Sequence, residues 1–168
     1  MSFRFVLMTL MLGSIVFSSV KPISAEKMVV DPTGRSVQVP DHPKRIIALA
    51  ANITEIVFAL GQQHRLVGAT RYSNYPAGAL RLPKVGSYIR LDLERILDLR
   101  PDLCIGVKDG NPIVIVRRIM ELGIPFYAVD PLNINAVVET VQAIGDLLNA
   151  RENTSTLVNQ MQNRINRI

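Results

Sequence analysis

The sequence has few of the residues on which several protein classes depend. It contains no Trp and one Cys in 168 residues, so it cannot form a disulfide within the chain. Two His and one Cys are too few for the three or four ligands of a zinc or transition-metal centre. No glycine-rich phosphate loop follows the first predicted strand, and neither a P-loop nor a G-x-S-x-G motif occurs. These absences exclude the commonest nucleotide-binding and hydrolase signatures.

The charged and reactive side chains that are present add little chemistry. The formal net charge is +5 at pH 7, but no basic run or basic helix face occurs, so nucleic acid is not an expected partner. Cys104 lies in an apolar segment and is predicted to be an inert core residue. Asp109 and Asp130 follow predicted strands. They could act as an acid–base pair, and they are equally well explained as turn and cap residues.

The first 25 residues have the layout of a secretory signal. A basic start is followed by an almost wholly apolar or small stretch at 5–20, and small residues end at Ala25 before the charged Glu26. This order is typical of a cleavable signal peptide, and the apolar stretch is short for a membrane-spanning helix. We expect cleavage and a periplasmic location. An uncleaved N-terminal anchor is the alternative.

After this segment, short apolar runs alternate with helix-length segments. A β-hairpin is predicted around the turn at 31–34. Strands are predicted at 46–49, 66–69, 103–107 and 126–129, and helices at 52–60, 92–99, 112–122 and 135–148. The first helix is expected to start at Asn52 as N-cap, with Glu55 three residues later, and to end before Gly61. Nearly continuous apolar strands between helices predict a Rossmann-like, doubly wound α/β domain, in which helices cover both faces of a parallel sheet.

Sheets of this kind bind ligands at the carboxyl ends of their strands. That edge comprises the predicted loops at 50–52, 70–91, 108–111 and 130–133. The second loop is unusually long, and it holds Tyr72, Tyr75 and Tyr88, three of the six aromatic residues after the signal segment. Aromatic rings in a loop favour a flat apolar ligand. The alternative is that these rings pin the loop onto the domain body.

The order and spacing of several segments carry a family resemblance. The segments are Pro43–Leu49, Asn52–Ile56, Val67–Ala69, Tyr72–Pro76, Val85–Gly86, Leu93–Ile96, Leu99–Leu103 and Leu122–Pro125. Across residues 28–168 the chain resembles the substrate-binding proteins of ABC importers for cobalamin, haem and iron–siderophore complexes. The resemblance implies two Rossmann-like lobes joined by one long helix, with the ligand between them. Residues 26–150 then correspond to the N-terminal lobe, and 151–168 to a truncated start of the inter-lobe helix.

The resemblance also implies ligand-binding residues. Tyr72 matches the position where cobalamin-binding members place an aromatic ring over the corrin, and Tyr88 lies where such members often carry Trp. Arg71 and Arg90 border the same loop. They could pair with siderophore carboxylates or haem propionates, or they could be solvated rim charges. Asn52, at the end of the first strand, completes the predicted ligand-binding set.

A second surface follows from the same resemblance. Glu94 matches the acidic residue that members present to arginines of the membrane permease, so it is predicted to dock on that partner. The local alternative is that Asp92 and Glu94 stabilise the first turn of a helix. The tail carries an apolar stripe of Leu157, Met161, Ile165 and Ile168 at helical spacing. The stripe packs on its own lobe, or it is exposed and promotes self-association through 157–168.

The sequence therefore predicts a periplasmic solute-binding component of an ABC importer that performs no catalysis and needs no cofactor or metal centre. Its expected partners are the permease and a metal-chelate ligand, with a corrinoid favoured over an iron–siderophore or haem. Two other classes stay open. One is a small secreted α/β enzyme or nucleotide binder that uses Asp109 or Asp130, and the other is a truncated lobe without independent function.

Overall fold

The structure, a computed structural model, describes residues 25–167. The predicted signal segment up to residue 24, and Ile168 of the tail stripe, lie outside this range. No helix in the described part of the chain has the length and apolarity that a bilayer crossing requires.

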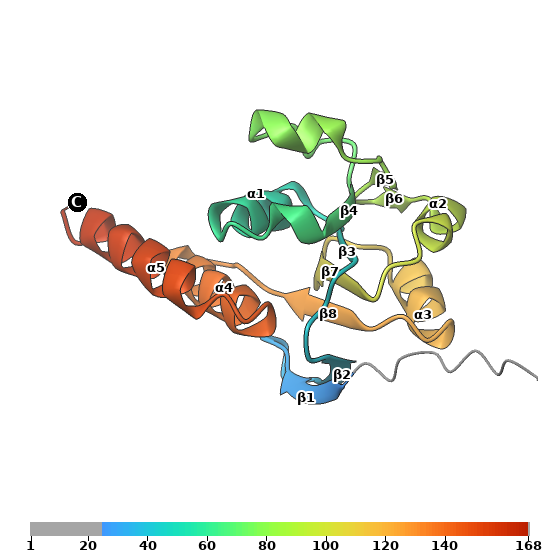
Figure 1. Cartoon of the computed structure of the whole chain (residues 1–168), viewed down its shortest axis with the longest axis horizontal. Helices are drawn as coiled ribbons and strands as arrows, with labels where there is room; N and C mark the ends of the chain where they lie inside the picture. Colours follow the sequence, from blue (N-terminus) through green and yellow to red (C-terminus); the bar gives the residue numbers. More distant parts are fainter. Residues whose placement is uncertain (1–24, 168) are drawn as a thin grey trace, which may run out of the picture.

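Four parallel strands form the central sheet, as predicted. They are β3 (Ile46–Ala48), β4 (Leu66–Ala69), β7 (Leu103–Val107) and β8 (Phe126–Val129). Their order across the sheet is β4-β3-β7-β8 (Figure 1). Nearly every residue of these strands is buried, which is why they read as continuous apolar runs rather than alternating ones.

Helices cover both faces of this sheet. On one side lie α1 (Ala51–Ala59), α4 (Ile134–Leu147) and α5 (Arg151–Ile165), and on the other lie α2 (Leu93–Asp98) and α3 (Ile113–Glu121) (Figure 1). A short 3₁₀ turn, η1 (Gln63–Arg65), links α1 to β4. The predicted doubly wound, Rossmann-like α/β architecture is thereby confirmed.

Each face of the sheet has its own hydrophobic core, because successive strand residues point to opposite faces. Ile46 and Ala48 belong to the core under α1, α4 and α5, whereas Ile47 and Leu49 belong to the core under α2 and α3. Cys104 lies fully buried in the second core, as predicted. Its burial, together with the charge of Asp102, raises the pKa of the thiol to about 12.

The predicted hairpin is present as β1 (Glu26–Val30) and β2 (Ser36–Pro40), which pair antiparallel. Its turn reaches the outer strand of the central sheet, where the Asp31 carboxylate accepts a hydrogen bond from the backbone N–H of Ala128 at 3.3 Å. The hairpin is therefore joined to the domain through its turn as well as through its strands.

The start of α1 differs from the prediction. The N-cap is Ala50, which makes no side-chain cap bond, and Asn52 lies inside the first turn with its Oδ1 accepting from the neighbouring Ile53 N–H at 3.0 Å. Glu55 is exposed and completes no capping box. Ala50 is buried, so packing of the strand–helix connection sets where the helix begins. The predicted end is correct, since Gly61 follows with a φ of 70°.

The first part of the tail stripe packs on the body of the domain. Leu157, Val158 and Met161 of α5 are partly buried against the core beneath α1 and α4. For Leu157 and Met161, the structure therefore supports packing within the chain rather than exposure to solvent.

Candidate functional site

The long segment after β4 is an ordered extension of the sheet edge. It contains the 3₁₀ turn η2 (Ala77–Arg81), visible in light green in Figure 1, and a two-stranded pair formed by β5 (Gly86–Ser87) and β6 (Arg90–Leu91). The Arg71 N–H donates to Gly86 O at 2.7 Å. This contact brings the backbone that carries Tyr72 beside the backbone that carries Tyr88.

Buried hydroxyl groups fix the base of this segment to α1. The Thr54 hydroxyl donates to Ser73 Oγ at 3.0 Å, and Thr70 Oγ1 lies 3.0 Å from the same oxygen. All three side chains are buried. Ser73 is next to Tyr72 in sequence, and Thr54 is two residues after Asn52. The cluster therefore joins the two segments that carry these predicted site residues.

Lys84 holds the same segment from its other end. Its Nζ donates to the backbone oxygens of Ser73 and Ala79, both at 2.8 Å. Burial lowers the pKa of Lys84 from its ordinary value. Sequence reasoning missed this residue, because nothing in the local sequence distinguishes it from a solvated lysine.

The loop tyrosines face solvent. Tyr72 is 60% exposed, Tyr75 is 67% exposed and Tyr88 is 45% exposed. The hydroxyl cluster and Lys84 hold the loop on the domain. Tyr72 and Tyr75 are mostly exposed, and Tyr88 is about half covered. The rings are free to contact a ligand.

The other predicted ligand-binding residues are also exposed, and they lie in α1 and in the segment that carries the rings. Asn52 is exposed in the first turn of α1, Arg71 follows β4 by two residues, and Arg90 pairs with Ser87 in the β5–β6 ladder. Both arginines are exposed, and within residues 25–167 neither side chain is part of an ion pair. Their guanidinium groups can thus meet an anionic group of a ligand.

Glu94 stands apart on α2. It is exposed in the first turn of that helix, where Asp92 is the N-cap and accepts from the Arg95 N–H at 3.0 Å. Both carboxylates therefore lie at the start of the helix, as the local alternative expects, with Asp92 as the cap and Glu94 in the first turn with its side chain exposed.

Exposed apolar side chains extend the same edge beyond the tyrosines. Ile113 and Val114 begin α3 after β7, and Leu132 and Ile134 lie at the start of α4 after β8. These four side chains are between 58% and 78% exposed. Sequence reasoning missed them, although apolar residues in the first turn of a helix are a usable signal of an unpartnered surface.

Asn111 is a further residue that the sequence did not single out. It is 7% exposed and lies between β7 and α3. Its side-chain amide bonds to three backbone groups, in β7, in the β3–α1 connection and at Tyr88.

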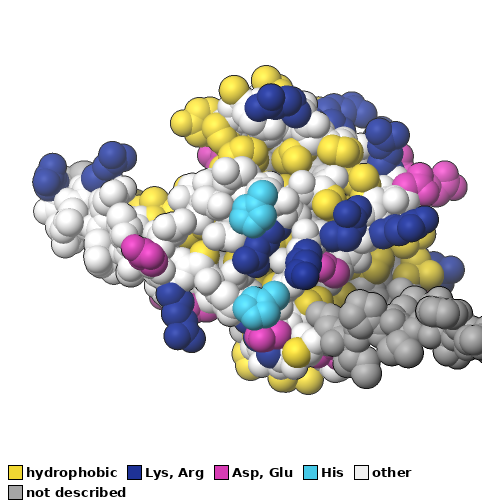
Figure 2. Space-filling model, viewed as in Figure 1, with side chains coloured by type: hydrophobic (Ala, Val, Ile, Leu, Met, Phe, Trp, Pro, Cys, Tyr) yellow, Lys and Arg dark blue, Asp and Glu magenta, His cyan; other side chains and the backbone are white. Residues whose placement is uncertain are grey.

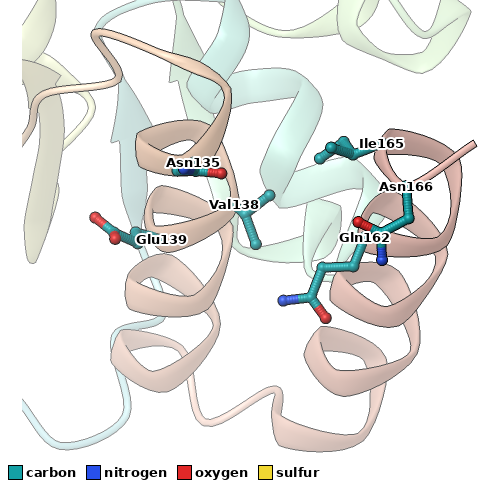
Figure 3. A pocket seen from close by; sticks show the side chains of 6 residues that line it. All are labelled: Asn135, Val138, Glu139, Gln162, Ile165 and Asn166. Atoms are coloured by element: carbon teal, nitrogen blue, oxygen red, sulfur yellow. The ribbon is translucent and has the colours of Figure 1, made fainter. Parts of the chain in front are cut away.

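Two other features lie away from these residues. A hollow of about 470 Å³ opens between α4 and α5, and in Figure 3 Val138 and Gln162 point into the space between these helices. None of the predicted site residues lines this hollow.

Figure 2 shows both histidines on one face among Lys and Arg side chains. His42 precedes β3 and His64 precedes β4, so both histidines lie toward the amino ends of these strands.

The described residues form no cluster of metal-ligating side chains, and one of the two candidate acids is ion-paired. In residues 25–167, no three His, Cys, Asp or Glu side chains are close enough to hold a metal ion. Asp130 forms an ion pair with Lys108, whose Nζ lies 3.2 Å from its Oδ2. Asp109 is exposed in the turn after β7.

Comparison with known proteins identifies a family and relatives with a similar sequence. Residues 46–168 match the model of a family described as "Periplasmic binding protein". The chain is 31% identical over 123 residues to a vitamin B12-binding protein of Yersinia pestis (strain Pestoides F), and the match covers 73% of this chain and 44% of that protein. The chain therefore spans less than half the length of this curated relative.

Solved structures agree. The periplasmic vitamin B12 binding protein of Vibrio cholerae is 30% identical with a TM-score of 0.67, and the match covers 74% of this chain and 49% of that one. A periplasmic heme binding protein from Pseudomonas aeruginosa is 26% identical with a TM-score of 0.71, covering 74% and 45%. The resemblance predicted from the sequence is confirmed, and the chain belongs to the periplasmic binding protein family.

Proposed function

We propose that this chain acts in a periplasmic solute-binding component of an ABC importer and contacts its ligand through the tyrosine-bearing edge of the sheet. The observation that carries this proposal is the pair of exposed rings, Tyr72 and Tyr88, on backbone segments joined by the Arg71–Gly86 hydrogen bond. A phenol ring offers a wide apolar face and a polar tip. Two such rings on an ordered edge suit a flat macrocycle.

The favoured ligand is a corrinoid. The relative from Yersinia pestis is named a vitamin B12-binding protein, and so is the structure from Vibrio cholerae. Haem is the alternative, supported by the Pseudomonas aeruginosa structure, and an iron–siderophore is a third ligand of related type. Arg71 and Arg90 would pair with acidic substituents of haem or of a siderophore through bidentate hydrogen bonds. A corrinoid would depend more on the rings.

Three further elements belong to this proposal. Residues 26–150 would form one lobe of the binding protein, and 151–168 the start of the helix that leaves it. Glu94 would dock on arginines of the permease, because its carboxylate is exposed and Asp92 supplies the helix cap. The signal segment at 1–25 would direct the chain to the periplasm.

We favour a role in ligand binding over a role in catalysis. The relatives described above are named as binding proteins. Asp130, a candidate for acid–base catalysis, is paired with Lys108.

Self-association through 157–168 stays a prediction, and sedimentation of the purified chain at several concentrations tests it. The burial of Leu157 and Met161 against their own lobe weakens its physical basis.

The experiment is a titration of the purified chain with cobinamide, cyanocobalamin, haemin and a ferric siderophore, followed by calorimetry or by ligand absorbance. We expect saturable corrinoid binding that Tyr72→Ala weakens and that Tyr72→Phe, which keeps the ring, largely preserves. Equal weakening by both variants would contradict a stacking role. No saturation with any of the four ligands would overturn the proposed function.

A further inference from the structure

We propose that Asn111 is the positioning residue of the ligand edge: its buried side chain fixes the Tyr88 segment to the carboxyl end of β3. This inference rests on the proposed function in one respect, namely that the ligand contacts Tyr88. Asn111 itself touches backbone and lies beneath the surface.

The geometry of one amide group carries the inference. Asn111 Oδ1 accepts from the Val107 N–H at 2.9 Å. Its Nδ2 donates to Leu49 O at 2.9 Å and to Tyr88 O at 3.0 Å. Leu49 is 62 residues away in sequence and Tyr88 is 23 residues away. A single side chain therefore joins three strand-end segments that the sequence separates.

The surroundings of Asn111 are shaped to admit this arrangement. A Cβ on Gly106 would lie 2.4 Å from Asn111 Oδ1, so only glycine leaves room for the amide there. A Cβ on Gly110 would lie 3.5 Å from Tyr88 Cδ2. The edge of the Tyr88 ring therefore passes over the residue next to Asn111, and both the ring and the main chain of Tyr88 rest on the β7–α3 connection.

The chemistry of the partners demands an amide. Two of them are carbonyl oxygens, which need N–H donors, and the third is an N–H, which needs an acceptor. Aspartate would keep the acceptor but would face both carbonyls with negative charge. Because Asn111 is buried, solvent cannot readily replace a lost bond, and an unpaired buried partner is costly.

A contribution to stability alone would not single out Tyr88, so the test is a double-mutant cycle. Corrinoid affinity is measured for the wild type, Asn111→Asp, Tyr88→Ala and the double variant. We expect Asn111→Asp to weaken binding by about tenfold, the size of one to two net hydrogen bonds. The double variant is expected to bind no more weakly than Tyr88→Ala alone, because Asn111 acts through Tyr88. Additive losses, or unchanged affinity in Asn111→Asp, would overturn the inference.

A matched control is available at the opposite edge of the sheet. The Asn149 side chain also donates to a backbone carbonyl, Asp41 O, and also accepts from a donor, Lys27 Nζ. Asn149→Asp makes the same chemical change far along the chain from the tyrosines and is expected to leave corrinoid affinity unchanged. Asn111→Ser serves beside Asn111→Asp, since it introduces no charge and is too short to reach Tyr88 O.

A second measurement needs no ligand and so separates this inference from the proposed function. The chain has no Trp and four Tyr, and Tyr127 is only 3% exposed. In a Tyr72→Phe/Tyr75→Phe background, acrylamide, a neutral quencher that the charge of Asn111→Asp does not repel, therefore quenches mainly the emission of Tyr88. We expect Asn111→Asp and Asn111→Ser to increase the quenching constant toward that of free N-acetyltyrosinamide, and Asn149→Asp to leave it unchanged. Unchanged quenching in both Asn111 variants would overturn the positioning role, even if the wild type binds a corrinoid.

Discussion

Arg35 closes a two-point ion pair on Asp31, with its Nη2 at 2.8 Å and its Nε at 3.1 Å from Asp31 Oδ2. The other carboxylate oxygen accepts from the Thr33 N–H and hydroxyl at 3.0 and 2.6 Å. Burial opposes ionisation of this carboxyl group, but hydrogen bonds from Thr33, Arg35 and Ala128 outweigh it and hold the pKa of Asp31 below its ordinary value. The turn of the N-terminal hairpin is thus organised around one anion.

This carboxylate predicts an acid-sensitive fold. Because its pKa is lower in the folded state than in the unfolded one, Asp31 adds stability above the unfolded pKa of about 3.9, and that stability is lost as the pH falls through the folded pKa. We expect Asp31→Asn to lower the free energy of unfolding at neutral pH by roughly 1–3 kcal/mol and to flatten its fall in acid. Urea unfolding from about pH 6 to about pH 2 measures both effects. Asp109→Asn, which changes an exposed carboxylate outside this turn, should retain the wild-type acid dependence.

Ser73 is predicted to stabilise the ligand edge through its hydroxyl. Ser73→Ala leaves Thr54 and Thr70 without their shared partner in a buried position, so we expect a loss of roughly 1–3 kcal/mol in the free energy of unfolding. Ser155→Ala, which removes an exposed hydroxyl on α5, should cost much less. Equal destabilisation by the two variants would contradict the importance of the cluster.

Lys84 is predicted to keep the segment at 70–91 closed against the domain. Lys84→Met preserves the apolar stem but removes the Nζ donor from Ser73 O and from Ala79 O, of which Ala79 O still accepts from the Leu82 N–H. We expect faster limited proteolysis within this segment and weaker corrinoid binding. Lys108→Met removes an exposed lysine that pairs with Asp130, and it should leave the cleavage rate in 70–91 unchanged.

Gly145 permits the close approach of α4 and α5. A Cβ at this position would lie 1.9 Å from Thr154 Oγ1 and 2.7 Å from Thr154 Cγ2. We expect Gly145→Ala to destabilise the protein by roughly 1–3 kcal/mol through overpacking. Adding Thr154→Ala should restore part of this loss, because it removes both of those atoms. Thermal unfolding of the two single variants and the double variant tests the contact, and additive destabilisation would contradict it.

The strands were predictable from sequence because they depend on local pattern, and the candidate site was inferred from the loops at their carboxyl ends. The segments 66–69, 103–107 and 126–129 match β4, β7 and β8 at every residue, since buried parallel strands are short apolar runs between turn residues. Tyr72 and Tyr88 stood out because aromatic residues are rare in this chain. Their exposure, and the order of the segment that carries them, agree with the sequence argument for a binding edge.

The support beneath that edge was not predictable, because it depends on contacts between distant residues. Asn111 bonds to Leu49 and Tyr88, and Ser73 bonds to Thr54, 19 residues earlier. No local pattern marks such partners. The start of α1 at Ala51 was missed for a similar reason: burial of Ala50 outweighs the capping preference of Asn52.

The hairpin turn has a consequence for how the protein behaves at high concentration. A parallel sheet can grow by adding a strand from another molecule wherever an outer strand offers free N–H and C=O groups. On β8 the Ala128 N–H is already taken by Asp31, and on β4 residue Ala69 exchanges hydrogen bonds with Pro83 and Val85. Each outer strand is thus engaged at one residue by another segment of the same chain, and this interrupts the row of groups that an added strand would need.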